Sequence, residues 1–116
     1  MFPLPFLILN FLSSLSFFGY GLSCLGTEGM KKEFDRFGLS NFRVLIGITQ
    51  LLGAAALAVG PWFVVWGLIA SAGLSLQMLA GVGVRIRIHD SLAQTIQAIG
   101  FLLINLFLCV SYIQNL

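Results

Sequence analysis

Four hydrogen-bonding side chains occupy matching positions in four apolar stretches of the sequence. Each lies seven or eight residues from a charged residue at the border of its stretch. In a helix, which rises 1.5 Å per residue, each would lie roughly 10–12 Å from that charged residue. Phenol and amide groups both donate and accept hydrogen bonds, so they could bond to one another or to a polar head group. The residues of this polar layer are Tyr20, Gln50, Gln77 and Gln97.

The polar layer has two interpretations. Its side chains could form hydrogen bonds between helices, each stabilising the protein by about 0.6 kcal/mol. Alternatively, three amides and one phenol offer more donors and acceptors than four mutual bonds consume, so the layer could line a ligand pocket. Four arginines would then form a basic mouth that attracts an anionic lipid head or an acidic partner. These arginines are Arg36, Arg43, Arg85 and Arg87.

Charged residues of both signs gather in two short segments that are far apart in the sequence. If the two segments meet at one membrane face, we expect an ion network between them. Arg43, together with Arg85 or Arg87, would hold carboxylates of the two segments. Exposed ion pairs stabilise a protein by only about 0–1 kcal/mol each. The residues of the predicted network are Glu33, Asp35, Arg36, Arg43, Arg85, Arg87 and Asp90.

Other reactive side chains do not form a recognisable site. The single histidine, His89, has no partner at metal-ligand spacing, so we expect no metal. Cys24 and Cys109 would lie at opposite membrane depths, roughly 27 Å apart along the helix direction. A disulfide needs Cα atoms within about 7 Å, so we expect none. No catalytic residue is predicted, and the net charge of +2 without a basic stripe argues against a nucleic-acid partner.

The composition is that of a membrane protein. Charged residues make up 9% of the chain and hydrophobic residues 59%, whereas ordinary soluble domains are about 25% charged. Four apolar runs are long enough to cross a bilayer, and a lone segment in lipid must be helical to satisfy its own backbone. We therefore expect an all-α polytopic membrane protein, a single four-transmembrane-helix bundle over residues 1–116. The expected spans are about 5–26, 44–60, 62–84 and 92–115.

The distribution of charge predicts the orientation of these spans. All Lys and Arg residues lie between the first and second spans or between the third and fourth, and none lies elsewhere. The positive-inside rule then places the charged loops in the cytoplasm and both termini outside, in the cell (inner) membrane. The N-terminal run lacks the basic start of a signal peptide, so we expect it to be retained as a helix. Trp62, Trp66 and Tyr112 would lie at the outer head-group level.

The charged segment 28–43 has a pattern of its own. Within Glu28–Phe37, Met30, Phe34 and Phe37 recur at helical spacing, and Gly38 follows as a C-cap. This pattern predicts an amphipathic helix on the cytoplasmic membrane surface with its Phe side toward the lipid. The alternative is a solvated charged loop that only sets the topology. Ser91 and Gln94 have the spacing of a capping box and should start the fourth span.

A row of polar residues and two rows of small residues predict how the helices pack. A polar row along the first span should face the bundle interior, and small residues in the second and third spans should allow close approach. The polar row is Asn10, Ser13, Ser16, Tyr20, Ser23 and Thr27. The small residues are Gly47, Gly53 and Ala54 in the second span, and Gly67, Ala70, Ser71 and Ser75 in the third.

Four stretches along nearly the whole chain resemble the DoxX-like family of small four-helix membrane proteins. They read GYGLSCL, EFDRFGLSNFRVLIGITQLLGAAAL, GLSLQMLAGVGVRIRIHDS and LLINLFL. The resemblance implies a membrane bundle but brings no established catalytic motif. The family takes its name from a membrane partner in quinone-linked thiosulfate oxidation. Relatives are similar to subunits of oxidative-stress complexes and, more distantly, to an animal chaperone of receptor assembly.

Two functions compete on this basis. The first is a non-enzymatic subunit or assembly and interaction factor, which binds a protein partner or a second copy of the chain within the lipid bilayer. The alternative is a quinone- or lipid-binding component of a sulfur or oxidative-stress redox system. No resident cofactor is expected, so electrons would come from a partner. A transporter is the third interpretation, disfavoured because no carboxylate lies within the spans.

Overall fold

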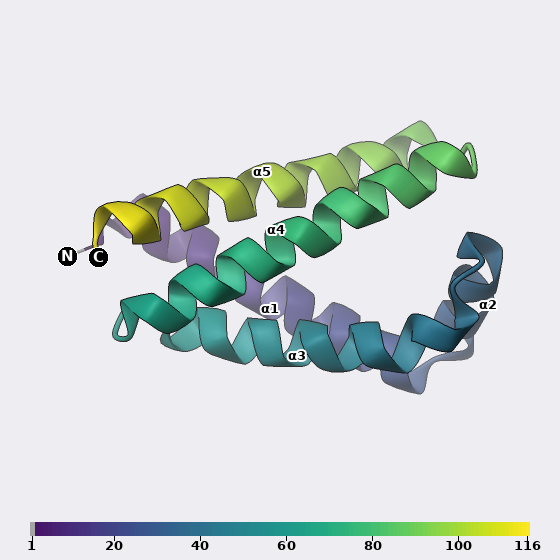
Figure 1. Ribbon diagram of the computed structural model, residues 1–116, viewed down its shortest axis with the longest axis horizontal. Coiled ribbons are helices and arrows are strands. Elements are labelled where there is room, and N and C mark those ends of the chain that lie inside the picture. The colour runs from purple at the N-terminus through teal and green to yellow at the C-terminus, as the bar shows by residue number, and fades with distance from the viewer. Residues whose placement is uncertain (1) are drawn as a thin grey trace.

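The computed structural model describes residues 2–116 and consists of helices joined by short turns (Figure 1). Four helices are long and apolar enough to cross a membrane, and no strand occurs within residues 2–116. The prediction of an all-α, polytopic membrane bundle is therefore confirmed. The elements are α1 (Leu4–Gly26), α2 (Glu28–Phe37), the 3-10 turn η1 (Ser40–Phe42), α3 (Arg43–Val59), α4 (Val64–Arg87) and α5 (Leu92–Gln114).

The four long helices form two pairs. α1 packs mainly against α3, α4 packs mainly against α5, and contacts between α3 and α4 join the pairs. The pairs converge where the two termini and the α3–α4 turn lie, and they diverge toward the opposite end, where α2 stands (Figure 1). We call these the closed end and the open end. Both charged segments lie at the open end.

Buried polar groups hold the closed end together. The Tyr112 hydroxyl donates to Asn10 Oδ1 over 2.6 Å, and Asn10 Nδ2 donates to the Leu57 carbonyl over 3.0 Å. Ser13 Oγ donates to Asn105 Oδ1 over 3.3 Å. The polar row of α1 thus faces the interior in its first half, as predicted. Tyr112 lies near the end of α5 and is fully buried, because its hydroxyl finds a partner in the core.

In the second half of the polar row, Ser16 and Tyr20 also face the space between the helices, but the serine and threonine hydroxyls bond within α1. Ser16 and Ser23 donate to carbonyls four residues earlier in their own helix, and Thr27 does the same while also capping α2. A serine or threonine in a helix can satisfy its hydroxyl in this way without a second helix. α1 therefore needs no interhelical partner for these side chains at the open end.

Helix boundaries differ slightly from the sequence prediction. α4 begins at Val64, two residues later than the expected third span, because the turn around Pro61 continues through Trp62. It ends at Arg87 rather than 84, so both arginines of the second charged segment lie in its last turn. α5 starts as predicted, with the Ser91 side chain accepting a hydrogen bond from Gln94 N.

Small residues lie where the helices approach most closely. Gly47, Ala54, Gly67, Ala70, Ser71 and Ser75 are buried, as the small-residue rows predicted. A Cβ at Gly47 would lie 3.0 Å from Cys24 Cβ, so this glycine lets α3 approach α1. Cys24 and Cys109 are both free thiols.

Candidate functional site

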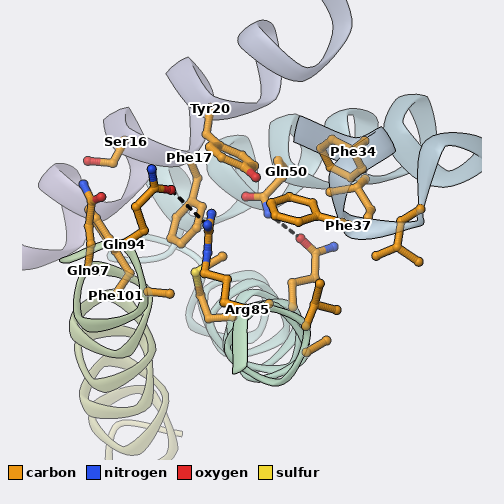
Figure 2. Close-up of a pocket in the computed structure, with 18 residues that line it drawn as sticks. Ser16, Phe17, Tyr20, Phe34, Phe37, Gln50, Arg85, Gln94, Gln97 and Phe101 are labelled. Atoms are coloured by element: carbon orange, nitrogen blue, oxygen red, sulfur yellow. Dashed lines mark hydrogen bonds between the residues drawn. The ribbon is translucent and has the colours of Figure 1, made fainter. Parts of the chain in front are cut away.

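A pocket of about 540 Å³ lies at the open end of the bundle, where the helix pairs diverge (Figure 2). This volume is within the range of about 300–1,000 Å³ that is typical of small-molecule sites. All four residues of the polar layer line it: Tyr20 from α1, Gln50 from α3, Gln77 from α4 and Gln97 from α5. The structure thus brings the four predicted residues to one pocket. Their role in ligand binding stays a prediction.

Helical periodicity explains why each helix contributes a coherent wall. α5 presents Gln94, Gln97, Ala98 and Phe101, which are three or four residues apart and share one face. α1 contributes Ser16, Phe17 and Tyr20 in the same way. Phe17 of α1 and Phe101 of α5 both line the pocket, and their rings meet edge to face at 5.6 Å.

A chain of hydrogen bonds joins α3 and α4 at one side of the pocket. Gln50 Nε2 donates to Gln77 Oε1 over 2.7 Å, and Gln77 Nε2 donates to Thr49 Oγ1 over 2.6 Å. Thr49 Oγ1 in turn donates to the Ile46 carbonyl over 2.8 Å. Half of the polar layer therefore forms an interhelical bond. Thr49 was not among the residues predicted to form the polar layer. Its position next to Gln50 in the sequence could have indicated that it belongs there.

The other two residues of the polar layer do not join this chain. Tyr20 is half-buried and Gln97 is exposed, and neither hydrogen bonds to Gln50 or Gln77. Equal depth along the helices was therefore not enough to bring four side chains into mutual contact. The divergence of the helix pairs separates α1 from α5 at this end, and so Tyr20 and Gln97 lie on different sides of the pocket (Figure 2).

α2 closes the pocket with aromatic side chains. Phe34 and Phe37 are buried, stack edge to face at 5.6 Å, and line the pocket. The amphipathic helix was predicted correctly, but its apolar side covers the pocket instead of facing the lipid surface. The bonds from Arg36 to Asp90 and from Arg87 to the Phe37 carbonyl hold α2 in this position.

Arg85 lies on the pocket wall contributed by α4, and its charge is neutralised there (Figure 2). Its Nη1 donates to Asp90 Oδ2 over 2.5 Å and to Gln94 Oε1 over 2.9 Å, and its guanidinium lies 5.2 Å from the centre of the Phe37 ring. Arg36 also donates to Asp90, over 3.0 Å, and to Glu33, over 2.7 Å. We call Glu33, Arg36, Arg85 and Asp90 the ion cluster. Its two positive and two negative charges cancel.

Two predicted members of the ion network have other partners. Arg43 donates to the carbonyls of Cys24 and Leu25, and Arg87 donates to the Phe37 carbonyl over 2.9 Å. These carbonyls belong to the last turns of α1 and α2, where unpaired carbonyls and the helix dipole attract cations. Asp35 makes no ion pair within residues 2–116. Of the four arginines predicted to form a basic mouth, only Arg85 lines the pocket.

The ion cluster predicts how stability depends on pH. Hydrogen bonding to Arg36, and further to Ser91 N and Arg85, lowers the pKa of Asp90 to about 2. Because the unfolded value is about 3.9, the stability that ionised Asp90 contributes is complete above that value and is lost as the pH falls toward 2. In thermal unfolding, wild type should exceed Asp90→Asn by a constant margin from about pH 5 to 7 and by a smaller margin below about pH 4.

A matched control for this measurement is Asp35→Asn, which removes a carboxylate without an ion-pair partner. We expect it to unfold like wild type throughout the range. A margin between wild type and Asp90→Asn that changes between about pH 5 and 7 would contradict the assigned pKa.

Comparison with known proteins finds one family. The sequence model of a protein family, described as the DoxX-like family, matches residues 8–109. This range includes every residue that lines the pocket and every member of the ion cluster. No curated protein and no solved structure matches the chain.

Proposed function

Because this chain belongs to the DoxX-like family, we propose that it is a multi-pass membrane protein that binds an amphipathic, lipid-soluble molecule in the pocket at its open end. The molecule would be a quinone or a lipid. We further propose that the chain acts as a non-enzymatic subunit of a membrane complex. This proposal combines the two functions expected from the sequence, which are quinone or lipid binding and the role of a non-enzymatic subunit.

The pocket itself is the observation that carries the proposal. Its walls are apolar and aromatic, yet Tyr20, Gln50 and Arg85 each place a hydrogen-bonding group on them. A site that combines apolar walls with a few convergent polar groups is typical of small-molecule binding. A bundle that required only packing would close this space, as it does around Tyr112 at the other end.

The chemistry of the lining supports the proposed subunit role. The residues that line the pocket are apolar, amide, hydroxyl, phenol and guanidinium groups, with no metal-ligating cluster within residues 2–116. We propose that a quinone bound here exchanges electrons with a partner protein. A lipid bound here would stabilise the bundle or its contact with a partner.

Removal of Gln50 tests the proposal. Gln50→Leu keeps the size of the side chain but deletes its amide, and we expect several-fold less quinone or lipid to copurify in mild detergent, since a lost buried hydrogen bond costs about 1–3 kcal/mol. Mass spectrometry of the extracted lipids measures this. Gln114→Leu, the same change at an exposed position outside the pocket, is the control. Equal bound lipid and quinone in wild type and both variants would show that the polar residues only pack.

We propose that the protein lies in the cell (inner) membrane, with its open end facing the cytoplasm and both termini outside. All six Lys and Arg residues belong to the segments at this end, and such residues concentrate on the cytoplasmic side. With Cys24 and Cys109 replaced, Lys32→Cys should resist an impermeant thiol reagent in whole cells, whereas Trp62→Cys at the closed end should react. Both positions are exposed. Labelling of Lys32→Cys from outside would mean that the orientation is inverted.

A further inference from the structure

One buried oxygen at the pocket has no hydrogen-bond partner. Gln50 is only 1% exposed, and its Oε1 is the buried side-chain atom within residues 2–116 that lacks a partner. Figure 2 shows Gln50 on the pocket wall, and its nitrogen donates to Gln77 Oε1. A buried polar group left without a partner destabilises a protein, so this oxygen calls for a donor.

The hydrogen-bond chain fixes which atom of Gln50 remains free. The Thr49 hydroxyl uses its single hydrogen on the Ile46 carbonyl, so toward Gln77 it can only accept. Gln77 must therefore point its nitrogen at Thr49 and its oxygen at Gln50. Gln50 then points its nitrogen at Gln77, and the atom left for a guest is an acceptor. A ligand carbonyl or ether at this position would place two acceptors against each other.

The charge of the pocket selects the head group further. Arg85 is the charged residue on the pocket wall, and Asp90 already neutralises it. Asp90 also pairs with Arg36, which pairs with Glu33, so the ion cluster has two positive and two negative members. A phosphate head would meet no uncompensated cation here and would lose its hydration. The pocket therefore favours a neutral head group.

The walls around this acceptor are aromatic. Tyr20, Phe17 and Phe101 lie on one side, and Phe34 and Phe37 of α2 close the other (Figure 2). Aromatic rings pack favourably against another flat ring, either edge to face or offset. An aliphatic glycerol head would not use this surface equally well.

We propose that the ligand is a neutral lipid whose head is a hydroxylated aromatic ring, of the phenol or hydroquinone class, with its hydroxyl donating to Gln50 Oε1. The proposal rests on the function proposed above and narrows it. The pocket distinguishes a hydroquinone from the corresponding quinone, because only the reduced form carries the hydrogen that Gln50 accepts.

A pair of compounds that differ by one hydrogen-bond donor tests this. Radiolabelled para-nonylphenol is bound to wild-type protein in lipid nanodiscs, with unlabelled para-nonylphenol and its methyl ether, para-nonylanisole, as competitors. Empty nanodiscs give the background. We expect the phenol to compete about tenfold better than the ether, which corresponds to one buried hydrogen bond. In Gln50→Leu the two should compete within about twofold of each other.

The outcomes separate this inference from the proposed function. Saturable binding in which phenol and ether compete equally would overturn the donor requirement while leaving a lipid-binding pocket. No saturable binding of the phenol, together with no copurifying quinone or lipid, would overturn both. Dioctanoylglycerol, which has a hydroxyl without a ring, should compete poorly; competition equal to that of the phenol would overturn the aromatic head.

A second competition experiment, under anaerobic conditions with decylubiquinol and decylubiquinone as competitors, distinguishes a membrane hydroquinone from another phenolic lipid. A preference for the quinol of about tenfold supports the donor requirement and points to a hydroquinone of the membrane. Equal competition by quinol and quinone would overturn the selection by Gln50. If the quinol competes much less well than para-nonylphenol but still better than the quinone, the proposal stands and the source is another phenolic lipid.

Discussion

Gly67→Ala is expected to destabilise the bundle by about 1–3 kcal/mol, the usual effect of inserting a methyl group into a filled core. The new Cβ would lie 2.5 Å from ring atoms of Tyr112 and 2.9 Å from the Cα of Gly60. Tyr112 cannot withdraw easily, because it is fully buried and its hydroxyl is bonded to Asn10. The second contact is with backbone, which yields less readily than a side chain. The closed end should therefore separate.

A change of the same kind elsewhere in α4 provides the control. A Cβ at Gly73 would meet nothing within 4 Å, so Gly73→Ala should unfold at or above the wild-type temperature, because alanine also favours the helix. Thermal unfolding of the three proteins in one detergent gives the comparison. If Gly67→Ala and Gly73→Ala were equally stable, Tyr112 of α5 would not be packed against Gly60 and Gly67 as described.

Gly81→Leu is expected to empty the pocket and leave the bundle folded. Gly81 lines the pocket, and a Cβ there would meet nothing within 4 Å. A leucine can therefore enter the space without displacing a neighbour, and it would occupy volume that a bound head group needs. We expect bound quinone or lipid to fall about tenfold or more, as it would for a loss of about 1.4 kcal/mol or more in binding free energy.

Gly83→Leu is the matched control, two residues further along the same helix. Its Cβ also meets nothing within 4 Å, but Gly83 is exposed and does not line the pocket. It should keep the wild-type content of ligand, measured by mass spectrometry of extracted lipids, and both variants should unfold near the wild-type temperature. Equal loss of ligand in the two variants would place the ligand outside the pocket.

The sequence predicted those features that depend on one helix at a time. The four spans follow from apolar length, the α3–α4 turn from Gly60 and Pro61, and the start of α5 from the Ser91 capping box. The common depth of Tyr20, Gln50, Gln77 and Gln97 also follows from spacing within each helix. This depth was compatible with interhelical bonds and with a ligand pocket; in the structure all four residues line one pocket, and Gln50 and Gln77 also bond to each other.

Features that depend on the rotation and divergence of helices could not be predicted in this way. Sequence spacing does not show that α1 and α5 separate at the open end, and so it could not show that Gln97 would be exposed. It also does not show which helix termini lie beside an arginine. Arg43 and Arg87 bind terminal carbonyls of α1 and α2 because those termini lie within reach, and this left Arg36 to pair with Asp90.

The position of α2 depends on the same divergence. Its amphipathic pattern is equally compatible with a membrane surface and with a protein surface, since both bury Phe34 and Phe37. Only the space between the helix pairs, together with the bonds from Arg36 to Asp90 and from Arg87 to the Phe37 carbonyl, places α2 over the pocket.

Native mass spectrometry of the wild-type chain, released from a mild detergent, tests the occupancy of the pocket most directly. We predict a population of chains that each retain one neutral molecule, with a mass that fragmentation assigns to a membrane quinol, quinone or other neutral lipid. Chains that carry no bound molecule under conditions that keep the bundle folded would contradict the proposed function. So would chains that carry only the acidic phospholipids of the surrounding membrane in variable number.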